Sequence, residues 1–303
     1  MVYYSRENEF NRPYFELRDR QMITFEQFVK EYGDFRLEIS MDIPDGKVVG
    51  IIGKNGSGKS TTIKAILGLV KPTAGSVKVF GREARALTPR DKEQLGVALS
   101  DSMFSEVLSL EDVIAILRAM YREFDETFFR DMCAKFGLPL KKPLKEFSTG
   151  MKAKARVLTA IGHHARLLIL DEPTAGLDVE ARQEIIAFLK DYAGSNACTI
   201  LITSHISTDL EGLCGEFYLF SRGRIVLHET DENIGRNYGT VQIPFELFDR
   251  IDRGRIAGFR KETFGYACIT NDKRYFEENH PELKVKSADI DDFILLLGGG
   301  TDE

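Results

Sequence analysis

The sequence predicts an α/β protein with a mixed sheet at its core, and three observations lead to this prediction. Strand-length apolar runs alternate with helical patterns between residues 151 and 228, as in parallel sheets that helices cover on both faces. A strand, a Gly-rich turn and a helical pattern also follow one another from residue 47 to residue 69. After Asn233, Gly and Pro interrupt short aromatic and β-branched runs, which predicts a small C-terminal α+β appendage.

The composition is that of an ordinary globular protein. Of the 303 residues, 43% are hydrophobic and 29% are charged, which excludes a disordered or fibrous chain. Lys and Arg number 41 against 47 Asp and Glu, and the net charge of -6 argues against a chain that mainly binds nucleic acid. No apolar stretch reaches the ~18 residues of a membrane helix, and residues 1–20 lack the apolar core of a secretory signal. We therefore expect a cytoplasmic protein.

The pattern predicts the following order of elements. Residues 48–52 form a buried strand, and residues 75–81 alternate between polar and apolar side chains, which predicts a half-buried antiparallel strand. From about residue 108 to residue 147 the apolar positions follow a helical period, which predicts a helical insertion. The remaining expected elements are a helix from Met151, strands at 167–170 and 199–203, helices at 179–192 and 208–213, and strands at 216–221 and 224–228.

These elements divide the chain into an N-terminal part (1–21), a main domain (22–234) with a helical subdomain at about 100–150, and a C-terminal accessory domain (235–303). The first part is an extension, a disordered tail or the result of a misplaced start codon. The four cysteines are widely spaced without a C-x-x-C pair, so we expect reduced structural thiols and neither a zinc site nor a disulfide framework. They are Cys133, Cys198, Cys214 and Cys268.

The most informative stretch is residues 53–61, which match the pattern G-x-x-x-x-G-K-[ST]. Its glycines let several backbone N–H groups point at one place, and the following helix adds the positive end of its dipole, so that together they solvate a phosphate chain. Lys59 is placed to reach the β- and γ-phosphates, and Ser60 offers its hydroxyl to Mg²⁺. The expected nucleotide-binding residues here are Gly53, Asn55, Gly56, Ser57, Gly58, Lys59, Ser60 and Thr61.

A second candidate motif is the carboxylate pair Asp171 and Glu172, which ends the apolar run 167–170. A buried parallel strand delivers such residues to the carboxyl edge of a sheet, where nucleotides bind. Alone, the pair would more often be a loop start or a helix cap. Beside a phosphate loop, we expect Asp171 to hold Mg²⁺ directly or through water, and Glu172 to accept a proton from the water that attacks the γ-phosphate.

Residues 147–151 complete a family resemblance. Their sequence, Phe-Ser-Thr-Gly-Met, resembles the Leu-Ser-Gly-Gly-Gln signature of ABC transporter nucleotide-binding subunits, from which it departs at three of five positions. The similarity runs from about residue 23 to residue 234 and implies a P-loop NTPase cassette with a mixed sheet core, a helical insertion and an antiparallel β subdomain. By resemblance, Ser148 and Gly150 face the γ-phosphate of a nucleotide held by the other subunit, and the helix from Met151 aims its positive end there.

Three further positions follow the family's order. Residues 175–178 resemble the loop through which two subunits communicate, so the resemblance makes Asp178 part of the nucleotide site. His205 stands where the family's switch histidine contacts the γ-phosphate, and we count it with Glu172 and Lys59 as a catalytic residue. Tyr32 resembles the aromatic residue that stacks on adenine, with Phe35 as the alternative.

One position departs from the family. Where ABC subunits usually carry a glutamine that joins the catalytic core to the helical insertion, this sequence has Ser100. A serine is too short to reach the metal as glutamine does. Either Asp101 or a water substitutes for it, or the coupling between nucleotide and transporter differs in this protein.

The resemblance implies a subunit that binds ATP with Mg²⁺ and hydrolyses it at the interface of a nucleotide-sandwich homodimer or heterodimer. It further implies a separate transmembrane permease that docks on the helical insertion and holds the subunit on the inner face of the membrane. A methionine at the last signature position, as at Met151, resembles the exporter-like (ABC-2 type) branch of the family. We therefore expect export and no nucleic-acid partner. The alternative is a soluble ABC ATPase that acts on nucleic acid or ribosomes, although a single cassette with an acidic balance weakens it.

The C-terminal part, residues 235–303, resembles the accessory tails of some exporter ATPases. Such tails regulate the ATPase or help it to dimerise. We favour a dimer-stabilising domain without a ligand. The sequence does not identify the transported substrate, because the substrate contacts only the permease.

Overall fold

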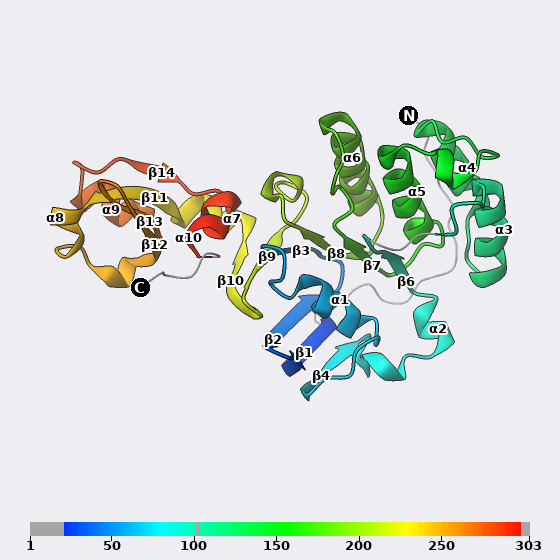
Figure 1. Cartoon of the computed structure of the whole chain (residues 1–303), viewed down its shortest axis with the longest axis horizontal. Helices are drawn as coiled ribbons and strands as arrows, with labels where there is room; N and C mark the ends of the chain where they lie inside the picture. The colour runs from blue at the N-terminus through cyan, green and yellow to red at the C-terminus, as the bar shows by residue number, and fades with distance from the viewer. Residues whose placement is uncertain (1–20, 101–103, 298–303) are drawn as a thin grey trace.

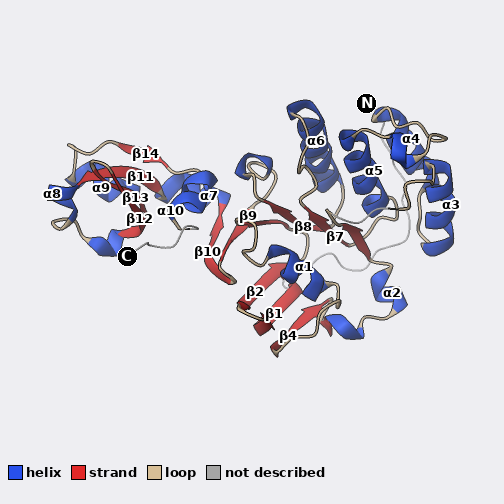
Figure 2. Ribbon diagram, viewed as in Figure 1, coloured by secondary structure: helices blue, strands red, loops and turns tan. Residues whose placement is uncertain are grey.

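The computed structural model describes residues 21–100 and 104–297, which form three sheets with their helices (Figure 1). Two of the sheets belong to the cassette on the right of Figure 1, and the third forms a separate C-terminal lobe on the left. Figure 2 shows the helices gathered mainly around the six-stranded sheet. The prediction of an α/β fold with a mixed sheet, a helical insertion and an antiparallel β subdomain is confirmed.

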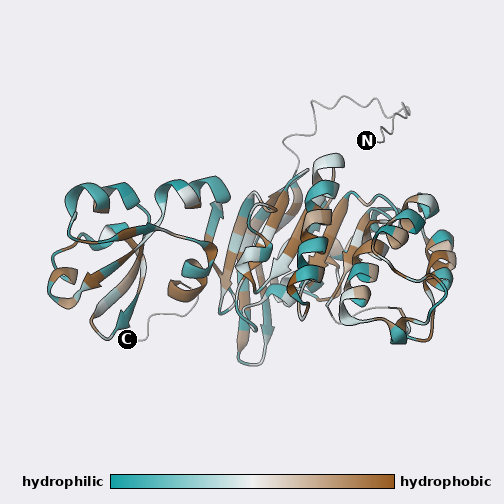
Figure 3. Ribbon diagram, turned by 90° about the horizontal axis from the view of Figure 1, so that it is seen from above, coloured by the Kyte–Doolittle hydropathy of each residue, from teal (hydrophilic) through white to brown (hydrophobic). Residues whose placement is uncertain are grey.

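The central six-stranded sheet has the order β10-β9-β3-β8-β7-β6, in which every neighbouring pair is parallel except β9 with β10. Every residue of β7 and β8 is buried, as expected for parallel strands that helices cover on both faces. Figure 3 shows these apolar strands in the middle of the molecule. The strands are β3 (Val48–Ile52), β6 (Leu95–Ala98), β7 (Leu167–Asp171), β8 (Thr199–Ser204), β9 (Glu216–Ser221) and β10 (Arg224–Thr230).

A four-stranded antiparallel sheet in the order β2-β1-β4-β5 forms the β subdomain. In β2 every second side chain is buried, so this sheet turns one apolar face towards α1 and the neighbouring sheet. The expected half-buried strand at 75–81 is β4, which pairs with β1. The strands are β1 (Gln21–Tyr32), β2 (Phe35–Pro44), β4 (Ala74–Val79) and β5 (Arg82–Glu83).

The helices of the cassette begin with caps that the sequence supplies. Ser109, Asp125, Ser148 and Asp178 each accept a hydrogen bond from a backbone N–H of the first turn, which satisfies a donor that the helix itself leaves free. The expected helical insertion consists of α3 and α4, of which α4 contacts α5. The helices are α1 (Lys59–Ile66), α2 (Pro89–Lys92), α3 (Leu110–Met120), α4 (Glu126–Lys135), α5 (Thr149–Ile161) and α6 (Val179–Ser195).

The C-terminal lobe is a four-stranded antiparallel sheet in the order β12-β13-β11-β14, with short helices against it. The lobe has an apolar core of its own, which includes Cys268 and Phe276. Its helix α10 lies on the side nearest to the cassette and contacts the cassette turn η3 (Ser207–Asp209) (Figure 1). The elements are α7 (Asp231–Asn237), β11 (Gly239–Pro244), α8 (Phe245–Phe248), β12 (Ile256–Glu262), β13 (Gly265–Thr270), α9 (Lys273–Asn279), β14 (Val285–Ser287) and α10 (Ile290–Leu296).

One expected helix is wrong. Residues 208–213 do not form a helix: the turn η3 covers Ser207–Asp209, and the chain then continues as turns. Gly212 has a φ of 63°, which interrupts a right-handed helix, and Leu210 is fully buried against the strand that contains Gly50. Of the expected N-terminal part, residues 1–20 lie outside the described residues, and Gln21 is the first residue of β1.

All four cysteines are buried and unpaired, as the sequence predicts. Burial raises the pKa of the Cys198 thiol to about 11, which keeps it protonated and unreactive at neutral pH. Within residues 21–100 and 104–297, no helix combines the length and the apolar character that crossing a membrane requires.

Candidate functional site

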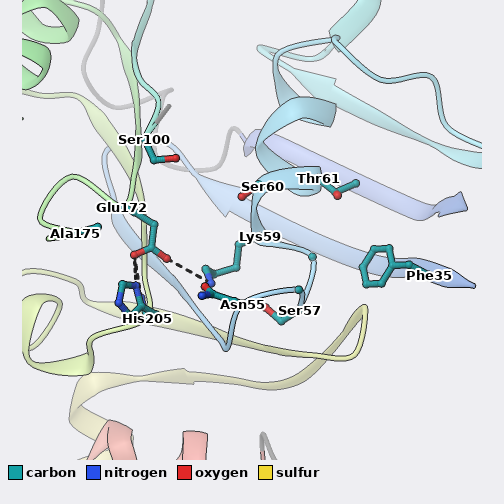
Figure 4. A pocket seen from close by; sticks show the side chains of 12 residues that line it. Phe35, Asn55, Ser57, Lys59, Ser60, Thr61, Ser100, Glu172, Ala175 and His205 are labelled. Atoms are coloured by element: carbon teal, nitrogen blue, oxygen red, sulfur yellow. Dashed lines mark hydrogen bonds and ion pairs between the residues drawn. The ribbon is translucent and has the colours of Figure 1, made fainter. Parts of the chain in front are cut away.

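Three parallel strands deliver the candidate residues to one edge of the central sheet (Figure 4). β3 leads into the phosphate loop, β7 ends at Asp171, and its neighbour β8 ends at Ser204, one residue before His205. Because β3 and β7 both pair with β8, the loops that follow them lie side by side. The topology therefore brings together residues from three distant parts of the sequence.

The phosphate loop adopts a backbone that requires glycine. Gly53 and Gly58 have φ values of 157° and 118°, a range that other residues rarely adopt. A Cβ at Gly53 would lie 2.4 Å from the Phe220 carbonyl oxygen, and a Cβ at Gly58 would lie 2.8 Å from a methyl group of Leu37. The loop wraps closely because these positions carry no side chain, and α1 begins directly after it at Lys59.

Lys59 is buried at the centre of this loop. Its Nζ donates to the carbonyl oxygen of Gly53 at 2.6 Å and lies 3.4 Å from Oε1 of Glu172. The ammonium group is thus held by the loop and by one of the candidate catalytic carboxylates. Both partners are groups that an incoming phosphate can replace, because a phosphate oxygen is itself a strong acceptor for the same donor.

Two hydroxyl groups hold the carboxylate of Asp171. Thr203 donates to Oδ1 at 2.7 Å and Ser100 donates to Oδ2 at 3.1 Å. Asp171 is only 5% exposed, and a buried carboxylate needs such donors. Each oxygen keeps an unused lone pair, so the carboxylate can still act as a metal ligand.

Glu172 has an unusual backbone and a close partner. Its φ is 49°, in the left-handed region, where a non-glycine residue costs about 1–3 kcal/mol. Its N–H donates to the carbonyl and the hydroxyl oxygens of Thr203, at 3.1 and 3.0 Å, which holds it in this conformation. Its Oε2 lies 2.5 Å from Nδ1 of His205 (Figure 4). The strained backbone thus directs the carboxylate towards both Lys59 and His205.

These groups surround an open cavity of about 600 Å³. Ser57, which is 4% exposed, is one of the lining residues, but its hydroxyl is buried and has no hydrogen-bond partner among the described residues. What suits a polyphosphate in this lining is the Gly-rich loop itself, which leads directly into the N-terminus of α1. The lining residues are Phe35, Asn55, Gly56, Ser57, Gly58, Lys59, Ser60, Thr61, Ser100, Glu172, Ala175 and His205.

The described residues contain no cluster of three or more His, Cys, Asp or Glu side chains able to hold a metal ion. Ser60 lines the cavity and Asp171 is bonded to Ser100, another lining residue, so both candidate ligands lie at its edge. This donor set fits Mg²⁺, which takes few protein ligands and completes its shell with phosphate oxygens and water.

The signature residues lie in a second hollow. Ser148, Gly150 and Asp178 line it together, and none of the three lines the cavity of the phosphate loop. The hydroxyl of Ser148 caps α5 by accepting from the N–H of Met151 at 3.2 Å. One chain therefore places the phosphate loop and the signature in separate sites.

The structure places Phe35, and not Tyr32, on the wall of the cavity. The two residues face each other across the two-residue turn between β1 and β2. Tyr32 is 46% exposed with the Lys30 ammonium 4.9 Å from its ring centre, whereas the Phe35 ring lies beside Gly58 of the phosphate loop. Of the two aromatic candidates, Phe35 is therefore the one that borders the cavity.

Ser100 reaches the site through Asp171. Its carbonyl oxygen also accepts a hydrogen bond from Arg156 of α5, at 2.9 Å. A single residue thus contacts both the candidate metal carboxylate and the helix that begins at the signature. The other candidate substitute for the missing glutamine, Asp101, lies outside the described residues.

Sequence reasoning missed Thr203, which holds Asp171 by its hydroxyl and Glu172 by its backbone and side-chain oxygens. The available signal was weak: a hydroxyl residue near the end of a strand whose parallel neighbour ends in the carboxylate pair. Residues directly opposite in parallel strands share an edge, so this position was open to inference.

A Gly-rich loop at the start of a helix, a buried lysine and a carboxylate pair at the same sheet edge define a P-loop NTPase. The ABC transporter family model matches residues 37–175. The chain is 34% identical over 232 residues to the lantibiotic transport ATP-binding protein SrtF of Streptococcus pyogenes, an alignment that covers 74% of this chain and 99% of SrtF. The chain therefore belongs to the ABC transporter family of ATP-binding proteins, and it is an ATPase that drives transport.

Two further relatives extend this result. The bacitracin transport ATP-binding protein BcrA of Bacillus licheniformis is 29% identical over 283 residues, with 87% of this chain and 92% of BcrA covered. An alignment of that extent necessarily includes part of the C-terminal lobe. A solved structure described as the ATP binding subunit of an ABC transporter superimposes with a TM-score of 0.63 at 27% identity, covering 71% of this chain and 92% of that one.

Proposed function

We propose that this protein is the ATPase subunit of an exporter and that it works with a separate permease on the cytoplasmic side of the membrane. The proposal is supported by relatives named for lantibiotic and bacitracin transport. Both names refer to antimicrobial peptides, so the cargo class we propose is a peptide antibiotic. In this proposal the permease alone contacts the cargo, and the ATPase supplies the energy.

In the proposed site, ATP lies along the phosphate loop with its adenine against Phe35. The backbone N–H groups of the loop then donate to the phosphates. Ser60 and Asp171 are the proposed ligands of Mg²⁺, which when bound neutralises charge on the phosphate oxygens. Thr203 and Ser100 keep the Asp171 carboxylate in one orientation for this role.

We propose that Glu172 is the general base. Its carboxylate would accept the proton of the water that attacks the γ-phosphate, while Lys59 would turn from the carbonyl of Gly53 to the phosphates. His205 holds the other oxygen of Glu172 and stands at the same edge, where it can donate to the γ-phosphate. The single observation that carries this proposal is the contact of Lys59 and His205 with the two oxygens of one strained glutamate.

The proposed assembly is a dimer with two composite sites. The signature hollow with Ser148 and Gly150 is separate from the phosphate loop of the same chain, so a second chain has to bring its own signature to the nucleotide. A two-fold arrangement completes both sites with the same pair of surfaces. ATP would then hold the two chains together, and hydrolysis would release them.

Mixing two inactive variants tests the composite site. Glu172→Gln removes the proposed base, and Ser148→Arg blocks an exposed signature residue, so that neither variant alone retains an intact site. In a 1:1 mixture, half of the dimers are mixed and each has one intact site, so about a quarter of the parental ATPase activity is expected to return. A mixture as inactive as its components would contradict the shared site.

The export proposal has its own test. Cells sensitive to a peptide antibiotic would express this chain together with its permease, either as the parental protein or as Glu172→Gln. Protection by the parental chain alone supports ATP-driven export of that antibiotic. If the parental chain accelerates uptake into inverted vesicles for none of the peptides tried, the proposed cargo class is wrong while the ATPase assignment stands.

A further inference from the structure

The structure contains a buried carboxylate that the proposed chemistry does not use. Asp209 lies in the turn η3 and is 2% exposed. Its Oδ2 accepts a hydrogen bond from the hydroxyl of Thr174 at 2.5 Å, and Thr174 is 1% exposed. Its Oδ1 lies 3.5 Å from Nε of Arg182 on α6. A buried carboxylate is costly unless it is paired, so these two partners are what makes the position tolerable.

This hydrogen bond joins the same two loops that meet in the candidate site. Thr174 follows Glu172 by two positions, in the loop from β7 to α6, and Asp209 follows His205 by four positions, in the loop after β8. On the cavity side, the two loops meet through Glu172 and His205. On the buried side, they meet through Thr174 and Asp209. Two side-chain contacts, Glu172 with His205 and Thr174 with Asp209, therefore hold the two loops together.

The buried hydrogen bond between Thr174 and Asp209 matters because the backbone of Glu172 is strained. A left-handed backbone at a glutamate persists only when its surroundings enforce it. Thr203 fixes the N–H of Glu172, while the tie to Asp209 fixes the chain two residues further on. The segment that carries the carboxylate is thus held on both sides of the strained residue.

The partner of Oδ1 adds a third segment. Arg182 is in the first turn of α6, whose N-terminal cap is Asp178. Asp178 belongs to the loop 175–178, through which two subunits are expected to communicate. The carboxylate of Asp209 therefore contacts the loop from β7 to α6 at Thr174 and the beginning of α6 at Arg182. A shift of this loop would be transmitted to the turn that follows His205.

We propose that Asp209 is a positioning residue, which through Thr174 holds the loop of Glu172 and the loop of His205 as one unit. This inference rests on the proposed function, because it takes Glu172 as the base. Its content is separate: the proposed base is placed by a buried contact between two loops, in addition to the contact that it makes with His205 in the cavity.

The test is a double-mutant cycle on the purified full-length chain, using Thr174→Val, Glu172→Gln and the double variant. Thr174→Val keeps the shape of the side chain and removes its hydroxyl. We expect kcat to fall about tenfold, with KM and the dissociation constant of a fluorescent ATP analogue unchanged, because misplacement of a base affects the chemical step. In the Glu172→Gln background, we expect Thr174→Val to cause no further loss, because the base through which it acts is already gone.

Two controls separate positioning from a loss of folding. Thr174→Ser restores the hydroxyl and is expected to restore kcat, while Asp209→Asn keeps an acceptor for Thr174 and is expected to lose less activity than Thr174→Val. The thermal midpoint Tm of each variant is measured in parallel. If Thr174→Ser loses as much kcat as Thr174→Val, the hydroxyl is not what acts.

The outcomes distinguish this inference from the proposed function. A parental rate for Glu172→Gln shows that the assignment of the base is wrong. An inactive Glu172→Gln together with an unchanged kcat for Thr174→Val leaves the base in place and overturns the role of Asp209. An equal tenfold loss caused by Thr174→Val in both backgrounds also overturns it, because the effect then does not pass through Glu172.

Discussion

The cassette and the C-terminal lobe use two kinds of sheet, and the difference explains where functional residues gather. In the cassette, parallel β3, β7 and β8 send their following loops to one edge, where Lys59, Glu172 and His205 meet. In the lobe every neighbouring pair of strands is antiparallel, so the carboxyl ends of adjacent strands such as β12 and β13, and the loops that follow them, lie at opposite ends of the sheet. Parallel order therefore concentrates distant residues, whereas antiparallel order disperses them.

The two regions nevertheless share part of their cores. The side chains of β13 alternate between two faces: Cys268 belongs to the core of the lobe, and Ala267 and Ile269 pack into the apolar cluster of the cassette. Phe293 of α10 belongs to that same cluster, and so does Leu210, which follows η3. The lobe is thus attached beside the turn that carries Asp209. The two regions therefore differ in where the candidate functional residues lie, although their apolar cores are partly shared.

The largest expected effect concerns the chemistry. Replacing Glu172 by Gln keeps the shape of the proposed base and removes its ability to accept a proton, so kcat is expected to fall about 10²- to 10⁴-fold while ATP binding is retained. The control is Glu278→Gln in the lobe, where the carboxylate is also ion-paired, to Arg274. Steady-state ATPase assays check both variants. A comparable loss for Glu278→Gln would break the contrast between the regions.

The next effect concerns the shared packing. Phe293 is 1% exposed and contacts the Tyr238 ring edge-on at 5.0 Å, so Phe293→Ala is expected to destabilise the protein by about 3–5 kcal/mol. Its neighbour on the same helix, Leu295, is 46% exposed, and Leu295→Ala is expected to change stability by less than about 0.5 kcal/mol. Urea unfolding measures both. Equal effects of the two variants would show that α10 is not packed as described.

The sequence was most informative where a local motif coincides with a strand end. The phosphate loop and the carboxylate pair were found because their spacing along the chain is itself the signal, and the structure brings them to one cavity. The choice between Tyr32 and Phe35 could not be made this way. Both flank the same two-residue turn, and the path of that hairpin in space decides which ring borders the phosphate loop.

Other features depend on contacts between distant positions. Thr174 and Asp209 belong to no common motif, and only the pairing of β7 with β8 brings their loops together. The expected helix at 208–213 failed for a related reason, because Leu210 is buried against a central strand and Gly212 takes a left-handed φ. The local hydrophobic periodicity indicates neither the burial of Leu210 nor the left-handed φ of Gly212. Tertiary contacts override it at such turns.

A smaller effect is expected at Ser100. Ser100→Ala removes one of the two hydroxyl donors to Asp171, while Thr203 keeps the other, so the carboxylate loses orientation without losing its charge. We expect the Mg²⁺ concentration for half-maximal ATPase activity to rise about tenfold, with kcat recovered at saturating Mg²⁺. Ser76→Ala, which removes an exposed hydroxyl bonded to Glu26 in the β subdomain, serves as the control. An unchanged Mg²⁺ requirement would show that Ser100 does not act on Asp171.

The smallest effect is expected at the far end of the lobe. Phe264 lies in the turn between β12 and β13 and is 88% exposed, so its ring contributes little to either core. We expect Phe264→Ser to leave the ATPase rate of the isolated chain unchanged and to alter the free energy of unfolding by less than about 0.5 kcal/mol. Urea unfolding and ATPase assays of the same preparation check this. A loss of activity would mean that the turn between β12 and β13 influences the site, which would contradict the contrast between the two regions.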